Sequence, residues 1–160
     1  PGATIANTVV TSGSAAASDL NVGKLIAAKK TLDKNNVPTS DRHVIIHANS
    51  LASLLGDERA VSADYSSILA LSRGDVNTLL GFNVHMIGDR DEGGLAIDGS
   101  SDRTLFAFHK DSLGLGIGIA PKIEINYVPE KTSWLVTAMY SAGAISVDGN
   151  GQVDITCRES

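Results

Sequence analysis

The 160-residue chain has little charge, few aromatic side chains and a single cysteine. Charged residues make up 19% of it and aromatic residues 4%, whereas hydrophobic residues make up 42%. This composition is typical of a folded chain whose core is built mainly from Leu, Ile, Val and Ala. Because Cys157 stands alone, no disulfide can form within the chain, and the composition fits a reducing compartment.

A basic surface and a long apolar run are also missing. The formal net charge is -5 and no Lys/Arg cluster is present, which argues against a surface built to follow nucleic-acid phosphates. No run approaches the roughly twenty apolar residues of a membrane-spanning helix, and the N-terminus lacks a signal-peptide pattern. We therefore expect a soluble protein. Since the chain starts with Pro1, we expect a processed product or part of something longer.

Helix and strand signals alternate in the first half. Asn21 can cap an amphipathic helix that Pro38 ends, and HVIIH at 43–47 reads as a buried strand. Asn49 or Ser50 can cap a short helix that closes at Gly56. The pattern then predicts a helix with Ile68, Leu69 and Leu71, followed by a strand, FNVHMI. These signals predict a mixed α+β protein.

The second half is predominantly β. A loop rich in Gly, Asp and Ser at 88–103 precedes LFAF, IGIAPKIEINYV, WLVTAMYSAGAISV and QVDIT, with turns near 129–132 and 148–151. We expect these last strands to form one antiparallel set. Within 104–118 we expect Phe106, Phe108 and Leu113 to pack inside the protein.

Two patterns resemble metal sites without completing one. His43 and His47 fall on one side of the expected strand, but no nearby carboxylate or thiol completes a zinc set. Asp148, Asn150, Gln152 and Glu159 take the first, third, fifth and twelfth positions of a calcium loop. Val153 stands where that loop needs glycine. We therefore predict no metal site and interpret 148–151 as a hairpin turn.

Two further patterns resemble a nucleotide site and a nucleophile. Gly114, Gly116 and Gly118 lack the spacing of a dinucleotide-binding loop, so we interpret them as strand glycines that permit close backbone approach. The neighbours His109, Asp111 and Ser112 could form a small active site, but sequence neighbours on one turn seldom converge as a triad. We predict no catalytic residue, no cofactor-binding residue and no cofactor.

The segments at 20–55, 75–87, 104–118 and 123–147 resemble, in order, a branch of tailed-bacteriophage major capsid proteins. The shared pattern is a long helix, a proline-containing loop with D-R, a buried strand, a G-F strand, F-H-K-D before apolar residues, and a final strand pair. The resemblance covers about residues 20–157. It implies the Hong Kong 97-type capsid fold and a C-terminal portion of a longer subunit.

The resemblance also implies a division of the chain. Residues 1–18 would be an extended lead-in segment. Residues 19–40, with a spine helix, and residues 121–160, with long strands, would form a peripheral-type domain, and residues 41–120 an axial-type domain. The spine helix and the 88–103 loop are expected contact regions.

By the same resemblance, the function would be a structural one. The chain would be a major capsid subunit that self-assembles into an icosahedral virion shell around double-stranded DNA in the host bacterial cytoplasm. Its partners would be other copies in hexamers and pentamers, with scaffolding, portal or decoration proteins as further candidates. No sequence-specific nucleic acid and no membrane partner are expected.

Two alternatives remain open at this point. One is a small hydrolase or transferase that uses the turn with His109, Asp111 and Ser112. The other is a metal-responsive binding module. Loss of a measured turnover on substituting His109 or Ser112 would favour the enzyme, and assembly into shells would favour the structural role.

Overall fold

The first long helix, α1 (Val22–Lys34), has a side-chain cap at its start and a backbone reversal at its end. The Asn21 side chain accepts a 3.0 Å hydrogen bond from the backbone nitrogen of Lys24. Beyond the helix, Asn36 has a left-handed φ of 56°, and Pro38 cannot continue a helix. The predicted helix and its cap are confirmed.

The computed structural model describes residues 2–10, 13–14, 16–56, 78–89, 93–95 and 97–159. The predicted helix with Ile68, Leu69 and Leu71 lies outside these residues. Contacts divide the chain into two units. One comprises Pro1–Ser112 and Asp148–Ser160, and the other is Leu113–Val147.

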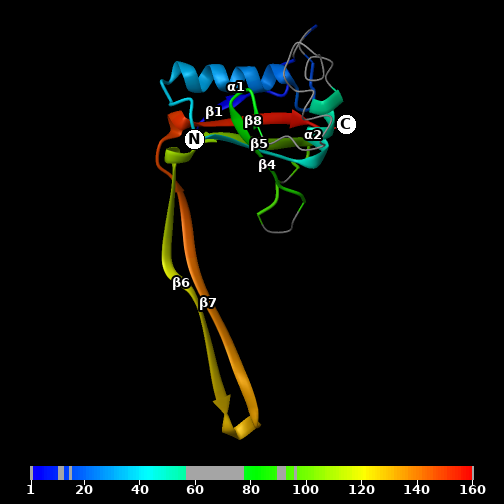
Figure 1. The fold of residues 1–160 in the computed structure, drawn as a ribbon. Helices are drawn as coiled ribbons and strands as arrows, with labels where there is room; N and C mark the ends of the chain where they lie inside the picture. Colours follow the sequence, from blue (N-terminus) through cyan, green and yellow to red (C-terminus); the bar gives the residue numbers. More distant parts are fainter. Residues whose placement is uncertain are drawn as a thin grey trace. The chain divides into compact units, whose positions relative to one another are not determined.

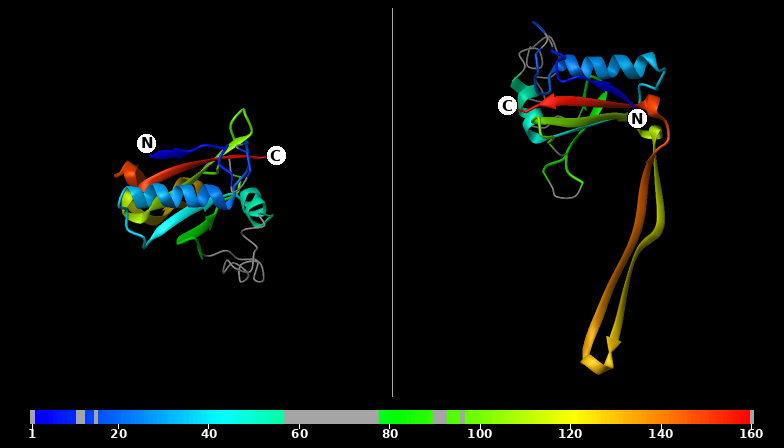
Figure 2. Two further views of the ribbon diagram at one scale, coloured as in Figure 1. Left: turned by 90° about the horizontal axis from the view of Figure 1, so that it is seen from above. Right: turned by 180° about the vertical axis from the view of Figure 1, so that it is seen from behind.

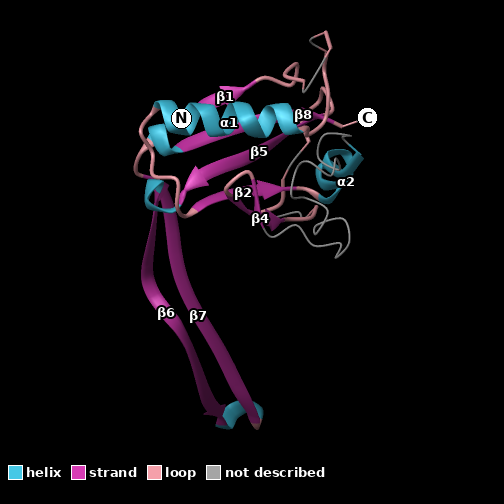
Figure 3. Ribbon diagram, turned by 45° about the horizontal axis from the view of Figure 1, so that its top comes forward, coloured by secondary structure: helices cyan, strands magenta, loops and turns pink. Residues whose placement is uncertain are grey.

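A six-stranded mixed sheet forms the centre of the first unit (Figures 1 and 3). Its strand order is β1-β8-β5-β2-β4-β3. The two pairs β1/β8 and β2/β4 are parallel, and the other neighbours are antiparallel. The strands are β1 (Ala3–Ile5), β2 (Arg42–Ile46), β3 (Thr78–Leu79), β4 (Phe82–Met86), β5 (Asp102–His109) and β8 (Gln152–Arg158).

Helix α1 lies across one face of this sheet, as both views in Figure 2 show. Leu25, Ala28 and Leu32 on the helix are at most 2% exposed. Their counterparts in the sheet include the buried residues Val44, Ile46, Leu105, Val153 and Ile155. The core of the first unit therefore combines residues from both ends of the chain.

The short helix α2 (Ala48–Gly56) begins earlier than the sequence predicted. Asn49 and Ser50 lie inside its first turn, and the His47 imidazole accepts a 3.3 Å hydrogen bond from the backbone nitrogen of Asn49. The expected cap was wrong because an imidazole nitrogen serves the backbone group that an Asn or Ser side chain usually serves.

The second unit is a long antiparallel hairpin of β6 (Leu113–Val128) and β7 (Ser133–Ser146). The two strands form a sheet of their own, and the short 3-10 helix Pro129–Lys131 lies at the turn between them. The strands and the turn were predicted, but one antiparallel set of all the last strands was not correct. β8 instead joins the six-stranded sheet, between β5 and β1.

The packing expected for the aromatic stretch was also wrong. Phe106 is 41% exposed and Leu113 is 42% exposed. Phe108 is only partly buried. Side chains alternate along β5, and the buried set is Arg103, Leu105, Ala107 and His109. The phenylalanines therefore point to the opposite face of the strand.

The predicted peripheral-type domain comprises residues 19–40 and 121–160, and the predicted axial-type domain comprises residues 41–120. Their boundaries differ from those of the two units described above, and this division stays a prediction. Within the predicted lead-in segment 1–18, β1 pairs with β8. Among the described residues, no helix combines the length and apolarity that crossing a membrane requires.

Candidate assembly surface and polar clusters

One face of the β6–β7 hairpin is a continuous apolar surface. Residues directly opposite each other in an antiparallel pair project to the same side. Ile117 pairs with Ala142, Ile125 with Val136, and Tyr127 with Trp134. We call the side-chain set on this side the apolar hairpin face: Leu115, Ile117, Ile123, Ile125, Tyr127, Trp134 and Val136.

The side chains of the apolar hairpin face are solvent-exposed in the single chain. Leu115 and Ile123 are each 70% exposed, and Trp134 is 69% exposed. The rings of Tyr127 and Trp134 contact each other, with centroids 5.1 Å apart. An isolated two-stranded hairpin is only marginally stable in water, so this face is suited to burial against another surface.

The other face of the hairpin is more polar. Lys122 and Glu124 form an ion pair of 2.5 Å there, and Asn126 follows two positions later. The amphipathic character of the hairpin was not predicted from the sequence. The signal was present in the alternation of IEINYV, where Ile123, Ile125 and Tyr127 are separated by polar residues.

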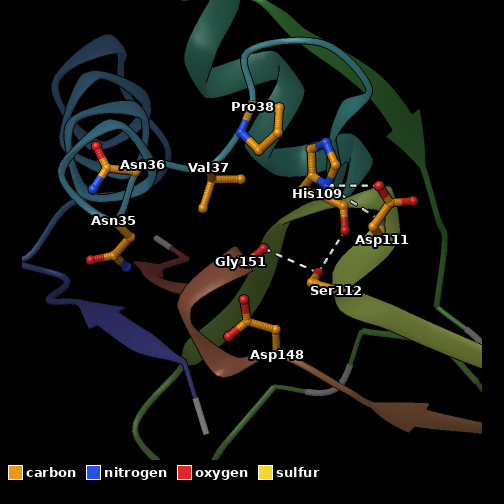
Figure 4. Close-up of a pocket in the computed structure, with 9 residues that line it drawn as sticks. All are labelled: Asn35, Asn36, Val37, Pro38, His109, Asp111, Ser112, Asp148 and Gly151. Carbon is orange, nitrogen blue, oxygen red and sulfur yellow. Dashed lines mark hydrogen bonds and ion pairs between the residues drawn. The ribbon is translucent and has the colours of Figure 1, made fainter.

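The sequence-predicted turn residues His109, Asp111 and Ser112 line a pocket of about 200 Å³ in the first unit, together with Pro38 and Gly151 (Figure 4). The Ser112 hydroxyl donates to the backbone oxygens of His109, at 2.6 Å, and of Gly151, at 3.2 Å. The His109 Nδ1 atom accepts from the backbone nitrogen of Asp111 at 3.2 Å.

These bonds serve the backbone rather than a reaction. The hydroxyl of Ser112 is directed to carbonyl oxygens, whereas a nucleophile would donate to a base. The Asp111 carboxylate lies 4.0 Å from His109 Nδ1, and its side chain is 86% exposed. The structure therefore gives no support to the hydrolase or transferase alternative at this turn.

The two histidines considered as metal ligands have different partners. His43 contacts His85, with 2.9 Å between His43 Nδ1 and His85 Nε2. His47 lies 3.5 Å from carboxylate oxygens of Asp89 and Glu159. Burial and the neighbouring His85 lower the pKa of His43. The contact with His85 could not be found from the sequence, because it depends on the pairing of β2 with β4.

A second polar cluster surrounds the buried Arg103. Its guanidinium donates to Glu159 Oε1 at 2.5 Å, to Asp89 Oδ1 at 2.8 Å and to the Leu95 carbonyl oxygen. Hydrogen bonding to Arg103 lowers the pKa of Glu159 and of Asp89. Glu159 therefore acts in an ion pair rather than in the calcium-loop pattern considered for it.

The rest of that calcium-loop pattern is a turn, but it is not the predicted hairpin turn, because β7 and β8 on either side of it belong to different sheets. The Asp148 carboxylate accepts a 2.9 Å hydrogen bond from the backbone nitrogen of Asn150, within the 3-10 turn Gly149–Gly151. No group of three or more His, Cys, Asp or Glu side chains within the described part of the chain is arranged to hold a metal ion.

Lys24 on α1 and Cys157 on β8 are both fully buried. Lys24 donates through its amine to the carbonyl oxygens of Ser18 and Thr156. Burial lowers the pKa of Lys24, and burial raises the pKa of the Cys157 thiol to about 12. The thiol is thus protonated and enclosed, as expected for a structural cysteine.

Residues 1–159 match a family model described as phage capsid protein. The chain belongs to this phage capsid family. No curated protein matched the chain in a sequence comparison. Family membership points to a structural protein.

Solved structures similar to this phage capsid family member include chains from three phages. A chain of Mycobacterium phage Che8 has a TM-score of 0.65 and 22% identity, and the match covers 96% of this chain and 53% of that one. The capsid structure of cyanophage P-SCSP1u has a TM-score of 0.64 and 17% identity, and the match covers 85% of this chain and 45% of that one. The mature capsid of bacteriophage PhiM1 has a TM-score of 0.58 and 12% identity, and the match covers 84% of this chain and 46% of that one.

At these identities the similarity concerns the fold. It confirms the α+β, Hong Kong 97-type capsid fold that the sequence resemblance implied. The capsid-family chain spans about half the length of the solved chains that it matches.

Proposed function

We propose that this chain forms part of a tailed-phage major capsid subunit, which self-assembles into the icosahedral shell around double-stranded DNA. The observation that carries the proposal is the apolar hairpin face in a member of the phage capsid family. Ile123 and Ile125 on this face are 70% and 63% exposed, so burial against another copy would remove substantial apolar surface from water.

The length of the hairpin suits repeated contacts. A strand of 16 residues extends roughly 50 Å, so one hairpin offers a long surface for contacts with other copies. In a closed symmetric assembly each contact is repeated in every copy, so modest individual contacts stabilise the whole shell. Hexamers and pentamers of the chain are the arrangement that we propose.

The charge of the chain is compatible with a shell that encloses DNA. A net charge of -5 gives no general attraction for phosphates, so the proposed shell would contain DNA without condensing it on its wall. Assembly in the host bacterial cytoplasm, and contacts with scaffolding, portal or decoration proteins, belong to the same proposal. So does the assignment of α1 as a spine helix.

Assembly of the full-length capsid subunit tests the proposal. Ile125→Asp places a charge on the apolar hairpin face, and Asn126→Asp places the same charge on the opposite face one residue away. Negative-stain electron microscopy and sedimentation velocity should show rings or shells for the unaltered protein and for Asn126→Asp. Ile125→Asp should remain small while keeping its circular dichroism spectrum.

Two results would contradict this expectation. If the unaltered subunit stays monomeric under assembly conditions, the shell function is wrong for this protein. If Ile125→Asp assembles as well as Asn126→Asp, the apolar hairpin face is not the surface that drives assembly.

A further inference from the structure

A pair of histidines lies on two neighbouring strands of the six-stranded sheet. β2 and β4 run parallel, with His43 opposite Asn83 and Ile45 opposite His85. His43 and His85 are therefore two positions apart across the pair, on the same face, which is a separation that long side chains can bridge. Their nearest ring nitrogens, His43 Nδ1 and His85 Nε2, are 2.9 Å apart.

A third aromatic ring restrains the orientation of His43. Phe108 on β5 is the cross-strand partner of His43, and the two ring centroids are 5.6 Å apart with an interplanar angle of 27°. On its other side, the His43 ring lies 5.1 Å from that of His85, at 28°. The His43 imidazole thus lies between two rings, which reduces the rotamer freedom that a ligand would have to remove.

The separation of the two nitrogens matches a particular coordination geometry. A first-row divalent metal lies about 2.0 to 2.1 Å from an imidazole nitrogen. Two nitrogens 2.9 Å apart would then subtend an angle of about 90° at the metal. This is the angle between neighbouring ligands in a square-planar or octahedral complex, whereas a tetrahedral complex needs a wider one.

We propose that His43 and His85 chelate a divalent transition metal, with Cu²⁺ and Ni²⁺ preferred over Zn²⁺. Neutral imidazole nitrogen is a common ligand for these ions, and nitrogen donors at neighbouring corners suit Cu²⁺ and Ni²⁺. The site does not depend on the proposed shell function.

The chain itself supplies two ligands. Among the described residues, no third His, Cys, Asp or Glu side chain joins the pair as a metal-binding group. His85 is exposed and His43 is partly exposed, so water can fill the remaining coordination positions. A two-ligand site of this kind binds its ion reversibly.

Calorimetric titration of the protein with Ni²⁺, Cu²⁺ and Zn²⁺ tests the proposal. In separate titrations, the unaltered protein should bind a single Ni²⁺ ion or a single Cu²⁺ ion at this pair. Either ion should bind more tightly than Zn²⁺. His43→Gln and His85→Gln should each weaken Ni²⁺ binding by at least about tenfold, because a lone imidazole remains. Lys110→Gln keeps both imidazoles and changes a nearby charge, so it serves as the control and should keep the site.

Electron paramagnetic resonance of the Cu²⁺ complex gives a readout that does not depend on the stability of a variant. Nitrogen hyperfine coupling should show two imidazoles in the unaltered protein and one in each single variant. The proposal is overturned if the unaltered protein shows a single imidazole, if Zn²⁺ binds more tightly than Ni²⁺, or if the folded double variant keeps the affinity for Ni²⁺. A single imidazole or an unchanged affinity would mean that the two rings form only a hydrogen bond, and tighter Zn²⁺ binding would mean that the geometry does not select for Ni²⁺.

Discussion

The amine of Lys24 donates a 3.0 Å hydrogen bond to the carbonyl oxygen of Thr156, across 132 positions of sequence. The lysine is fully buried, and it also donates to the carbonyl oxygen of Ser18. One charged side chain on α1 thereby joins the start of the helix to β8, the strand that ends near the C-terminus.

We expect Lys24→Met to reduce the free energy of unfolding by about 1 to 3 kcal/mol, because two carbonyl oxygens lose a charged donor while the aliphatic stem is kept. Lys30→Met, on the exposed side of α1, should change it by no more than about 0.5 kcal/mol. Urea denaturation measures both. Equal stability of the two variants would mean that the cost of burying the amine cancels its hydrogen bonds.

The cluster around Arg103 should make the fold sensitive to acid. The hydrogen bond from Arg103 lowers the pKa of Glu159 below its ordinary value of 4.5, and Asp89 is shifted in the same direction. Between the folded and unfolded pKa values the unfolded chain binds more protons, so stability rises with pH there. The contribution is present above about pH 4.5 and is lost as the pH falls through the folded value.

Glu159→Gln tests this contribution. The variant should show a smaller loss of stability between neutral pH and pH 3 than the unaltered protein, measured by thermal melting at each pH. His47 and Asn49 also face Glu159, and both are kept in the variant. A pH profile parallel to that of the unaltered protein would contradict the assignment of the acid sensitivity to this carboxylate.

Gly151 leaves no room for a side chain. A Cβ atom built there would lie 2.7 Å from the Cβ atom of Ser112. Gly151→Ala should therefore destabilise the protein by about 1 to 3 kcal/mol, as overpacking does. Gly99→Ala, where a Cβ would meet nothing within 4 Å, is the matched control and should stay within about 0.5 kcal/mol. Equal losses of stability for the two variants, measured by urea denaturation, would contradict the prediction.

The thiol of Cys157 should be unreactive in the folded protein. Its pKa is raised to about 12, and the side chain is fully buried. Alkylation by iodoacetamide at pH 8 should proceed far more slowly than in urea-unfolded protein, because only the accessible thiolate reacts. Rapid labelling of the folded protein, followed by mass spectrometry, would show that the strand opens frequently.

The sequence predicted what depends on local signals. Asn21 capped the predicted helix, and the turns near 129–132 and 148–151 lie where glycine, proline and aspartate indicated them. The partners of the strands were not predictable in the same way. Whether β8 pairs with β7 or with β5 depends on contacts between distant residues, which no local pattern specifies.

The same limit explains why the buried face of β5 and the contact between His43 and His85 were not predicted. Alternation along β5 places Phe106 and Leu105 on opposite faces of the strand. Which of the two faces is buried depends on α1, which covers the side with Leu105 and Ala107. Likewise, His43 gains His85 as a neighbour only through the register of β2 and β4. Side-chain size favoured a buried phenylalanine, and the position of the helix decided otherwise.

The two register shifts in β6 have a consequence for the length of that strand. Ile117 pairs with Ala142, Ile119 pairs with Ser141 and Lys122 pairs with Met139, so each shift adds one unmatched residue to β6. One such addition would exchange the two sides of the strand from that point on, and a second restores them. Because the number of added residues is even, the side chains before and after the two shifts stay on the same apolar hairpin face. Losing a single residue between Ile117 and Lys122 would turn Ile125 and Tyr127 to the polar side, whereas losing two would leave the pattern intact.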